Sequence, residues 1–312
     1  MFVIGSRMSL VFSPWSFLST LAEQTRAGLA VLPPDLLNSH TRFILSQQTP
    51  DGGFCGRRGA GDLYYTAFAT RALHGLNALS DDLKQQIASF VFQQKPGNIL
   101  DLLNALSILA LLNVETDEVI IPHPSSLIPP FRLSDGGYGK TQNDTSSSLY
   151  HSFLAVLCYD LIGEKPPDPD TLIAMTHAHR QPDGGFSETR THPVSSCNPT
   201  AAGLSLLNIL QGGDDTITNG VVRWLKTQQT PSGGWLAAPD APAPDLLSTY
   251  TAVFNLVLLD QLSKAEMASA LRFLKTCQPT SGGGFTAGPW DTAADVEYTS
   301  YGLSLLALAK QL

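Results

Sequence analysis

The sequence predicts an all-α fold in which about six helical hairpins form two concentric layers. A short glycine-glycine-aromatic turn recurs along the chain at a nearly constant period, and a segment of helical character follows each copy. Segments that are hydrophobic all round alternate with amphipathic ones, as expected where a buried inner ring packs against half-exposed outer helices. Strand patterns are weak throughout, so we expect little or no sheet.

The final repeat shows the pattern most clearly. Its three glycines, Gly282–Gly284, can take the positive φ that ends a helix, and Phe285 follows them. Asp295 then suits the N-cap of a new helix that contains Thr299. A Thr or Ser stands at the same place after each turn, and we take it as the marker of the repeat. The aromatic residues and markers are Phe54 and Thr66, Tyr138 and Ser152, Phe186 and Thr200, Trp235 and Thr251, and Phe285 and Thr299.

The markers are separated by 86, 48, 51 and 48 residues, so the first gap contains two repeats. Residues 93–112 form the hidden repeat, which keeps a Pro-Gly turn but lacks the glycine-glycine-aromatic signature. A repeat that runs from end to end indicates a single domain over residues 1–312.

The individual helices follow from this period. Residues 1–33 contain a helix, Ser16–Leu32, that completes the barrel, and Pro34–Gln48 is its partner. The outer helices are Asp81–Gln94, Thr216–Gln229 and Ser263–Cys277, and Val119–Arg132 is an outer helix degraded into a loop. The inner helices are Thr66–Leu79, Thr200–Leu210, Thr251–Leu262 and Thr299–Leu312.

Composition excludes several classes of function. Charged residues make up only 15% of the chain, which fits extensive buried helix surface or an apolar cavity. The net charge of −8 argues against a nucleic-acid partner. No apolar stretch is long enough for a membrane span, and Pro14 interrupts the apolar N-terminus, so we expect no signal peptide. The four cysteines form no CxxC pair, which is typical of a reduced, cytoplasmic protein.

The repeat resembles that of the protein prenyltransferase β-subunits and of the squalene and class II terpene cyclases. The residues that carry the resemblance are Gln-x-x-x-x-Gly-Gly-aromatic followed by Asp-x-x-Tyr-Thr, and they cover about residues 34–312. The resemblance implies an α/α toroid around one apolar central cavity that holds an isoprenoid. It also implies that the residue two before each marker faces this cavity. These residues are Tyr64, Tyr150, Asn198, Thr249 and Glu297.

The resemblance to the prenyltransferases raises the question of zinc. Those enzymes bind zinc through an Asp four before one marker, a Cys two before it, and a His one before the next marker. Here Asp62 matches the Asp, but Tyr64 replaces the cysteine, and His151 follows a repeat without an Asp–Cys pair. Cys197 is one residue out of register. The ligand set is incomplete, so we expect no metal and no other cofactor.

The cyclases carry Asp-x-Asp-Asp-Thr at the corresponding place, and its middle Asp protonates the substrate. This chain has Asp295-Val-Glu-Tyr-Thr299, so Glu297 occupies the position of the proton donor and Asp295 matches the first Asp. A carboxyl group in an apolar cavity has a raised pKa, as a general acid requires. Alternatively, Glu297 belongs to an exposed first turn, where the helix dipole favours it.

Basic and aromatic residues suggest how a substrate binds. Arg57 and Arg58 stand where prenyltransferases carry an Arg that contacts the diphosphate, although they are equally compatible with ordinary solvated charges. Aromatic side chains on the first turns of inner helices are expected to line an isoprenoid channel or to pack in the core. The predicted substrate-binding residues are therefore the two arginines, His151 and four aromatic residues, Tyr64, Phe68, Tyr150 and Tyr301.

Three functions remain open from the sequence. The first is a prenyltransferase-like protein that transfers a prenyl group to an acceptor, with a helical partner subunit as a possibility that the resemblance implies. The second is a cyclase that uses Glu297 as its acid. The third is a toroid without catalysis that binds a lipid or a protein. The sequence favours the first function, because the form of the repeat and the position of Arg57 match the prenyltransferases.

Overall fold

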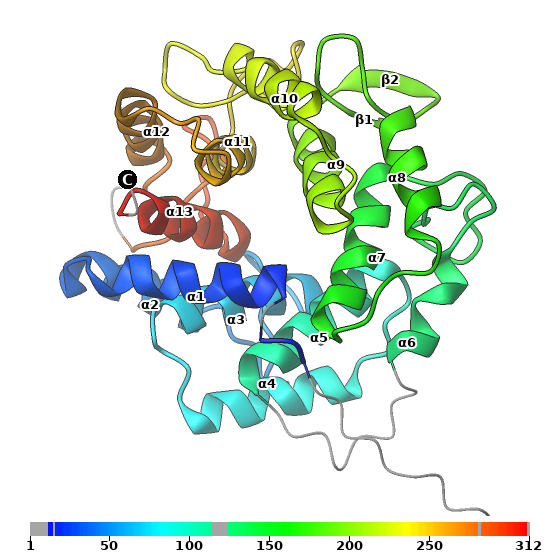
Figure 1. Ribbon diagram of the computed structural model, residues 1–312. Helices are drawn as coiled ribbons and strands as arrows, with labels where there is room; N and C mark the ends of the chain where they lie inside the picture. Colours follow the sequence, from blue (N-terminus) through cyan, green and yellow to red (C-terminus); the bar gives the residue numbers. More distant parts are fainter. Residues whose placement is uncertain (1–11, 15, 114–123, 280–281, 311–312) are drawn as a thin grey trace, which may run out of the picture.

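The computed structural model describes residues 12–14, 16–113, 124–279 and 282–310, and this part of the chain is almost entirely helical (Figure 1). Within it, the only sheet is a hairpin of β1 (Ser187–Thr189) and β2 (His192–Ser195). The predicted all-α class is therefore confirmed.

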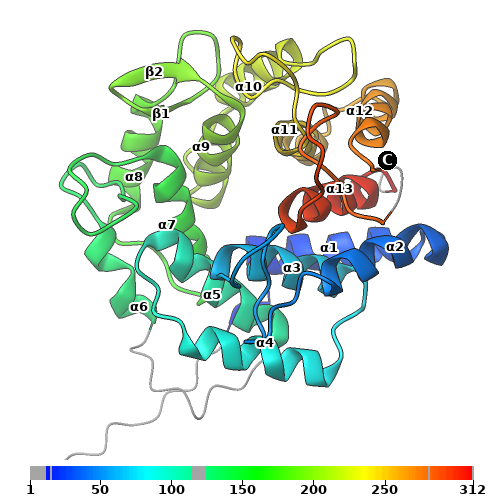
Figure 2. The same ribbon diagram turned by 180° about the vertical axis from the view of Figure 1, so that it is seen from behind.

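Six helices form a closed inner ring, in which each helix packs against the next and α13 packs against α3 (Figures 1 and 2). Most of their residues are buried, because they touch ring neighbours on both sides and an outer helix behind. The ring consists of α3 (Leu63–Gly75), α5 (Ile99–Leu112), α7 (Leu149–Leu161), α9 (Cys197–Ile209), α11 (Leu246–Leu258) and α13 (Val296–Leu308).

An outer layer surrounds this ring, as the amphipathic segments predict. Each outer helix precedes an inner helix in the chain. The outer helices are α2 (Pro34–Leu45), α4 (Asp81–Gln93), α8 (Pro169–Ala178), α10 (Asp215–Thr227) and α12 (Lys264–Thr276). Over its described residues, the third hairpin has only α6 (Pro124–Leu127) and the short 3-10 helix η1 (Pro129–Phe131) in this layer. The degraded helix predicted at 119–132 is thus reduced to two short pieces over its described part, and residues 119–123 lie outside the described residues.

The marker residues have a structural role that explains the repeat. In each of the five clear repeats, the marker hydroxyl accepts a hydrogen bond from the backbone amide of the aromatic residue in the turn. The five bonds, between 2.9 and 3.0 Å, join Phe54 to Thr66, Tyr138 to Ser152, Phe186 to Thr200, Trp235 to Thr249 and Phe285 to Thr299. All five aromatic side chains are buried. The marker therefore fixes the buried aromatic plug to the inner helix.

Two sequence assignments need correction. The marker of the fifth repeat is Thr249, not Thr251, because it is the Thr249 hydroxyl that binds the Trp235 amide. Inner helices also begin three residues before their markers, since the capping residue lies four before the marker. In α13, for example, the Asp295 carboxylate accepts the Tyr298 amide at 2.9 Å, and the helix starts at Val296.

Helix α1 (Phe17–Ala30) lies across the end of the ring where the inner helices finish (Figure 1). At one end of α1, the Phe17 amide donates to the Asp160 carboxylate of α7 at 2.6 Å. At the other, Gly28 packs on the backbone of Ala307 in α13, where a Cβ would lie 2.5 Å from the Ala307 oxygen. The approach of α1 to α13 therefore requires glycine at position 28.

No helix in the described ranges is both long and apolar enough to span a bilayer. The four cysteines are all buried and all free thiols.

Candidate functional site

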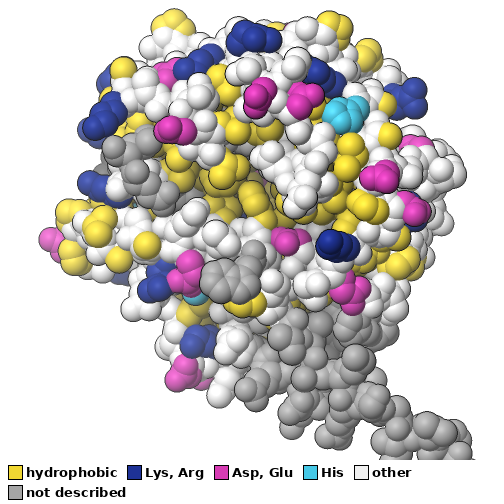
Figure 3. All heavy atoms as spheres, in the orientation of Figure 1, with side chains coloured by type: hydrophobic (Ala, Val, Ile, Leu, Met, Phe, Trp, Pro, Cys, Tyr) yellow, Lys and Arg dark blue, Asp and Glu magenta, His cyan; other side chains and the backbone are white. Residues whose placement is uncertain are grey.

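The ring surrounds a hollow whose wall is rich in aromatic side chains. Tyr150, Tyr250 and Tyr301 lie deep in the ring, where burial raises the pKa of each phenol, yet each keeps some accessible surface. Aromatic rings that lie deep in the ring of helices and still keep accessible surface line an internal space. Viewed from the side of α1, hydrophobic side chains gather in a hollow at the centre of the molecule (Figure 3).

The aromatic rings contact one another across several inner helices. Tyr64 meets Phe68 with ring centroids 5.0 Å apart, Phe68 meets Tyr301 at 5.2 Å, and Tyr301 stacks on Tyr250 at 5.3 Å. These contacts join α3, α13 and α11 into one continuous aromatic wall. Near α1, Phe17 touches Phe153 of α7 and Phe254 of α11, at 6.3 and 6.0 Å. Phe17 therefore helps to close that end of the hollow.

The Glu297 carboxylate lies beside this aromatic wall. The Tyr64 hydroxyl donates to Glu297 Oε1 at 2.7 Å, which links α3 to the first turn of α13. Burial raises the pKa of Glu297 above its ordinary value, and the nearby Asp295 carboxylate acts in the same direction. Hydrogen bonds from Tyr64 and Tyr301 oppose this rise without cancelling it. Glu297 is thus half-buried and better able to hold a proton than an exposed glutamate.

Asp295 is 4% exposed; it caps α13, and its carboxylate lies 3.4 Å from Arg57 Nε. Burial raises its pKa, and the Arg57 charge opposes the rise. Arg57 also forms an ion pair with Asp291, whose carboxylate accepts the Ala287 amide at 3.2 Å. The Arg57 guanidinium is therefore engaged by two carboxylates, where the resemblance would place a diphosphate.

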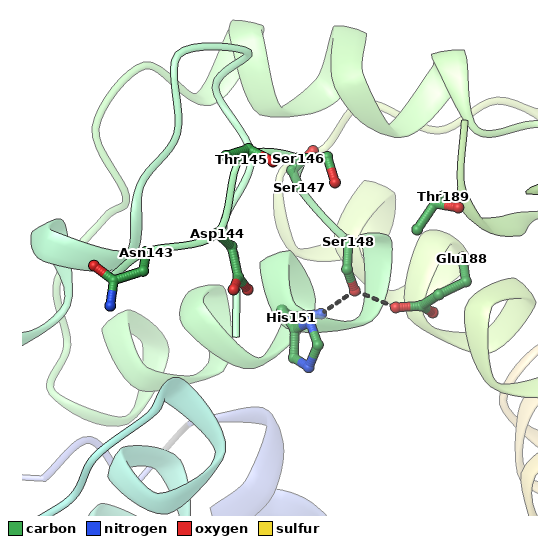
Figure 4. Close-up of a pocket in the computed structure, with 9 residues that line it drawn as sticks. All are labelled: Asn143, Asp144, Thr145, Ser146, Ser147, Ser148, His151, Glu188 and Thr189. Carbon is green, nitrogen blue, oxygen red and sulfur yellow. Dashed lines mark hydrogen bonds between the residues drawn. The ribbon is translucent and has the colours of Figure 1, made fainter. Parts of the chain in front are cut away.

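Two further predicted residues are not part of the aromatic wall, although the His151 ring lies 5.8 Å from that of Tyr150. Arg58 is exposed on the same loop as Arg57. His151 faces a separate polar pocket of about 480 Å³ at the start of α7, lined by Asn143–Ser148, His151, Glu188 and Thr189 (Figure 4). In this pocket Ser148 donates to Glu188 and accepts the His151 amide at 3.1 Å. Burial and the Lys140 charge lower the pKa of His151, although Asp144 opposes this. Glu188 was not predicted from the sequence.

The residues present do not fit a zinc site of the prenyltransferase type. With the corrected marker Thr249, the position two before it is Leu247 and the position one before is Ser248, so neither supplies a ligand. The buried Cys197 thiol donates to the Leu236 carbonyl at 3.1 Å, and burial raises its pKa, which disfavours the thiolate that zinc binds. No group of three or more candidate metal ligands occurs among the described residues.

Sequence reasoning missed two residues of the hollow. Tyr250 was overlooked because it lies one residue after the marker Thr249, and the resemblance assigned to the cavity only the residue two before each marker. Arg71 comes seven residues after Tyr64 and three after Phe68, so the three side chains share one face of α3. That spacing was a signal that could have identified it.

The chain belongs to the prenyltransferase alpha-alpha toroid domain family, whose model matches residues 5–193 and 199–312. The resemblance inferred from the repeat is thereby confirmed. No curated protein sequence matches the chain significantly.

Two solved structures share the toroid fold of this chain over nearly the whole of their own length. Protein geranylgeranyltransferase-I from Candida albicans, complexed with GGPP, is 16% identical, with a TM-score of 0.70 over 88% of this chain and 91% of its own. The type II terpene cyclase MstE from Scytonema, as a variant in complex with its product merosterolic acid A, is 13% identical. Its TM-score is 0.63, over 93% of this chain and 99% of that chain. At these identities the similarity establishes the toroid fold.

Proposed function

We propose that this protein binds an isoprenoid in the central hollow and starts its cyclisation by protonating a carbon–carbon double bond, with Glu297 as the acid. The observation that carries the proposal is the Glu297–Tyr64 hydrogen bond at the edge of the aromatic wall. It places a carboxyl group of raised pKa beside the rings of Phe68, Tyr301 and Tyr250.

The chemistry of such a site is balanced. The O–H bond of protonated Glu297 breaks as a C–H bond forms on the alkene, and the π electrons of that alkene supply the new bond. The resulting carbocation closes a ring by attack of a second alkene and then loses a proton to water, so the product is an isomer of the substrate. Aromatic faces stabilise the cation through their quadrupoles, by about 0.5–2 kcal/mol for each ring. Solvent then restores the proton of Glu297.

Asp295 has a positioning role in this proposal. Its negative charge raises the pKa of Glu297, and its capping bond to the Tyr298 amide fixes the first turn of α13. Asp295 itself is paired with Arg57 and lies outside the chain of aromatic contacts. It therefore acts on the substrate only through Glu297.

Transfer of a prenyl group from a diphosphate to an acceptor is the second candidate. Arg58 is exposed near the first turn of α3, and the N-termini of the inner helices offer partial positive charge to an anion. However, Arg57 would have to exchange its contacts with Asp291 and Asp295 for a phosphate. We place transfer second for this reason. A helical partner subunit and a cytoplasmic location remain predictions.

Glu297→Gln tests the proposal, because glutamine keeps the size of the side chain and removes the transferable proton. Purified protein is incubated with geranylgeranyl diphosphate or geranylgeranyl dihydroxybenzoate, and products are separated by liquid chromatography with mass spectrometry. The wild type should form an isomer of one substrate, and Glu297→Gln should form none. Asp240→Asn makes the same chemical change on an exposed loop and should retain turnover. Product formation by Glu297→Gln at the wild-type rate would refute the assignment of the acid.

A further inference from the structure

Arg71 lies on the third turn of α3, on the face that carries Tyr64 and Phe68. Its Nε donates to the Ala67 carbonyl at 3.2 Å, and its guanidinium carbon lies 4.4 Å from the centroid of the Phe68 ring. The Phe68 ring in turn contacts Tyr301 of α13. The guanidinium is therefore held against the aromatic wall, and the half-buried side chain does not extend freely into solvent.

Arg71 forms no ion pair with a carboxylate of the described residues; its charge acts on the Glu297 carboxylate, which carries a proton in the proposed function. Arg26, Arg57 and Arg132 each form an ion pair with a carboxylate, but Arg71 forms none. Apart from the bond of Nε to Ala67, no hydrogen bond of its guanidinium to a described residue is found. A guanidinium that leaves bulk water without a counter-ion loses solvation energy, which an anionic ligand would restore.

The guanidinium acts on side chains from several sides of the ring. Burial raises the pKa of Tyr150 on α7 and raises that of Tyr250 on α11 to about 12, and the Arg71 charge opposes both rises. The same charge acts on Tyr301 and Glu297 of α13. Arg71 thus lies within electrostatic reach of α7, α11 and α13, as expected for a cation near the middle of the hollow.

We propose that Arg71 binds the anionic group of the substrate, a carboxylate or a phosphate, inside the hollow, with the hydrocarbon chain extending from there toward Glu297. This inference rests on the proposed function and specifies its substrate class. The Arg71 guanidinium lies over the ring of Phe68, which is four residues, or about 6 Å along the helix axis, beyond Tyr64, the hydrogen-bond partner of Glu297. The anionic group and the double bond that is protonated are therefore at different positions along the substrate.

This orientation differs from one in which the anionic group stays at the Arg57 loop. Arg57 is already paired with Asp291 and Asp295, whereas Arg71 forms no ion pair with a described residue and packs on the Phe68 ring. A guanidinium also suits both proposed anions, because its parallel N–H groups match the oxygens of a carboxylate or a phosphate.

Equilibrium binding of three probes with the same hydrocarbon chain tests the inference. The probes are geranylgeraniol, geranylgeranoic acid and geranylgeranyl diphosphate, and affinities are measured by titration calorimetry on the full chain. The wild type should bind at least one anionic probe about ten-fold or more tightly than the alcohol, as a charge-assisted hydrogen bond allows. The acid and the diphosphate distinguish the two sources of the anion.

Arg71→Met should abolish the preference for the anionic probe while leaving the affinity for geranylgeraniol within about three-fold, because methionine keeps the apolar stem. Arg71→Lys should retain part of the preference, and Arg223→Met, which removes an exposed charge from α10, should retain all of it. The inference fails if the wild type binds the anionic probes no more tightly than the alcohol, or if Arg71→Met still prefers an anionic probe. It also fails if Arg71→Met weakens the binding of geranylgeraniol as much as that of the anionic probes. Failure of the wild type to bind any of the three probes would instead contradict the proposed function itself.

Discussion

Replacing Thr249 with valine should destabilise the fold, although the two side chains have nearly the same shape. The Thr249 hydroxyl accepts the Trp235 amide at 3.0 Å and donates to the Asp245 carbonyl at 2.7 Å. Thr249 and Trp235 are both fully buried. Valine removes the acceptor and leaves the Trp235 amide unpaired in the core.

The size of the effect follows from that single lost bond. The Asp245 carbonyl keeps its helical bond to the Thr249 amide at 3.0 Å, so only the Trp235 amide loses its partner. An unsatisfied buried donor costs about 1–3 kcal/mol. Thr249→Val should therefore lower the free energy of unfolding by this amount. Urea denaturation followed by circular dichroism would show a lower midpoint with an unchanged slope.

Thr251 provides the matched control, because it lies two residues away on α11, is only partly buried, and has no hydrogen bond from its hydroxyl to a described residue. Thr251→Val should change the free energy of unfolding by less than about 0.5 kcal/mol. Equal stability of Thr249→Val and the wild type, or a larger loss in Thr251→Val, would refute the assignment of Thr249 as the marker of the fifth repeat.

Three further predictions follow from the described contacts. Gly28→Ala should destabilise the protein by about 1–3 kcal/mol in thermal unfolding, because its Cβ meets a carbonyl oxygen at 2.5 Å, whereas Gly97→Ala, with open space around it, should not. Arg57→Met should lower the urea midpoint at pH 7, because it removes the ion pair with Asp291. The difference from the wild type should shrink below pH 3.8, because Asp291, whose pKa is lowered in the folded protein, gains a proton there and its stabilising contribution is lost. A pH–rate profile should show activity falling as the pH rises through a midpoint above 4.5, because Glu297 works only when protonated and burial raises its pKa. Tyr64→Phe should move that midpoint upward, because it removes a hydrogen bond that favours the carboxylate; a midpoint that does not move would count against this role of Tyr64.

The architecture could be predicted from the sequence because its signals are local and repeated. Glycine, an aromatic residue, a capping residue and a hydroxyl recur together, and each has a short-range role. The closure of the ring by α13 on α3 was implied by the family resemblance. The position of α1 was harder to predict from the sequence, because its contacts with α7 and α13 join residues far apart in the chain.

The site was harder to predict, because it depends on how side chains from different helices meet. The register identified Glu297 and Tyr64 as neighbours of one cavity, but their direct hydrogen bond required coordinates. The pairing of Arg57 with Asp291 joins loops more than 200 residues apart, and no local pattern signals it. Tyr250 lies one residue after its marker, outside the register position that the resemblance assigned to the cavity. The importance of Arg71 rests on its lack of an ion pair with a described residue, which only a folded structure can reveal.

Solvent isotope incorporation tests the central claim most directly. If Glu297 supplies a solvent-derived proton to a double bond, turnover of geranylgeranyl diphosphate or geranylgeranyl dihydroxybenzoate in D₂O should give a cyclised product that carries one non-exchangeable deuterium. Mass spectrometry of the purified product measures this label, and Glu297→Gln should yield neither product nor label. A cyclised or transferred product without deuterium would contradict proton-initiated chemistry at Glu297.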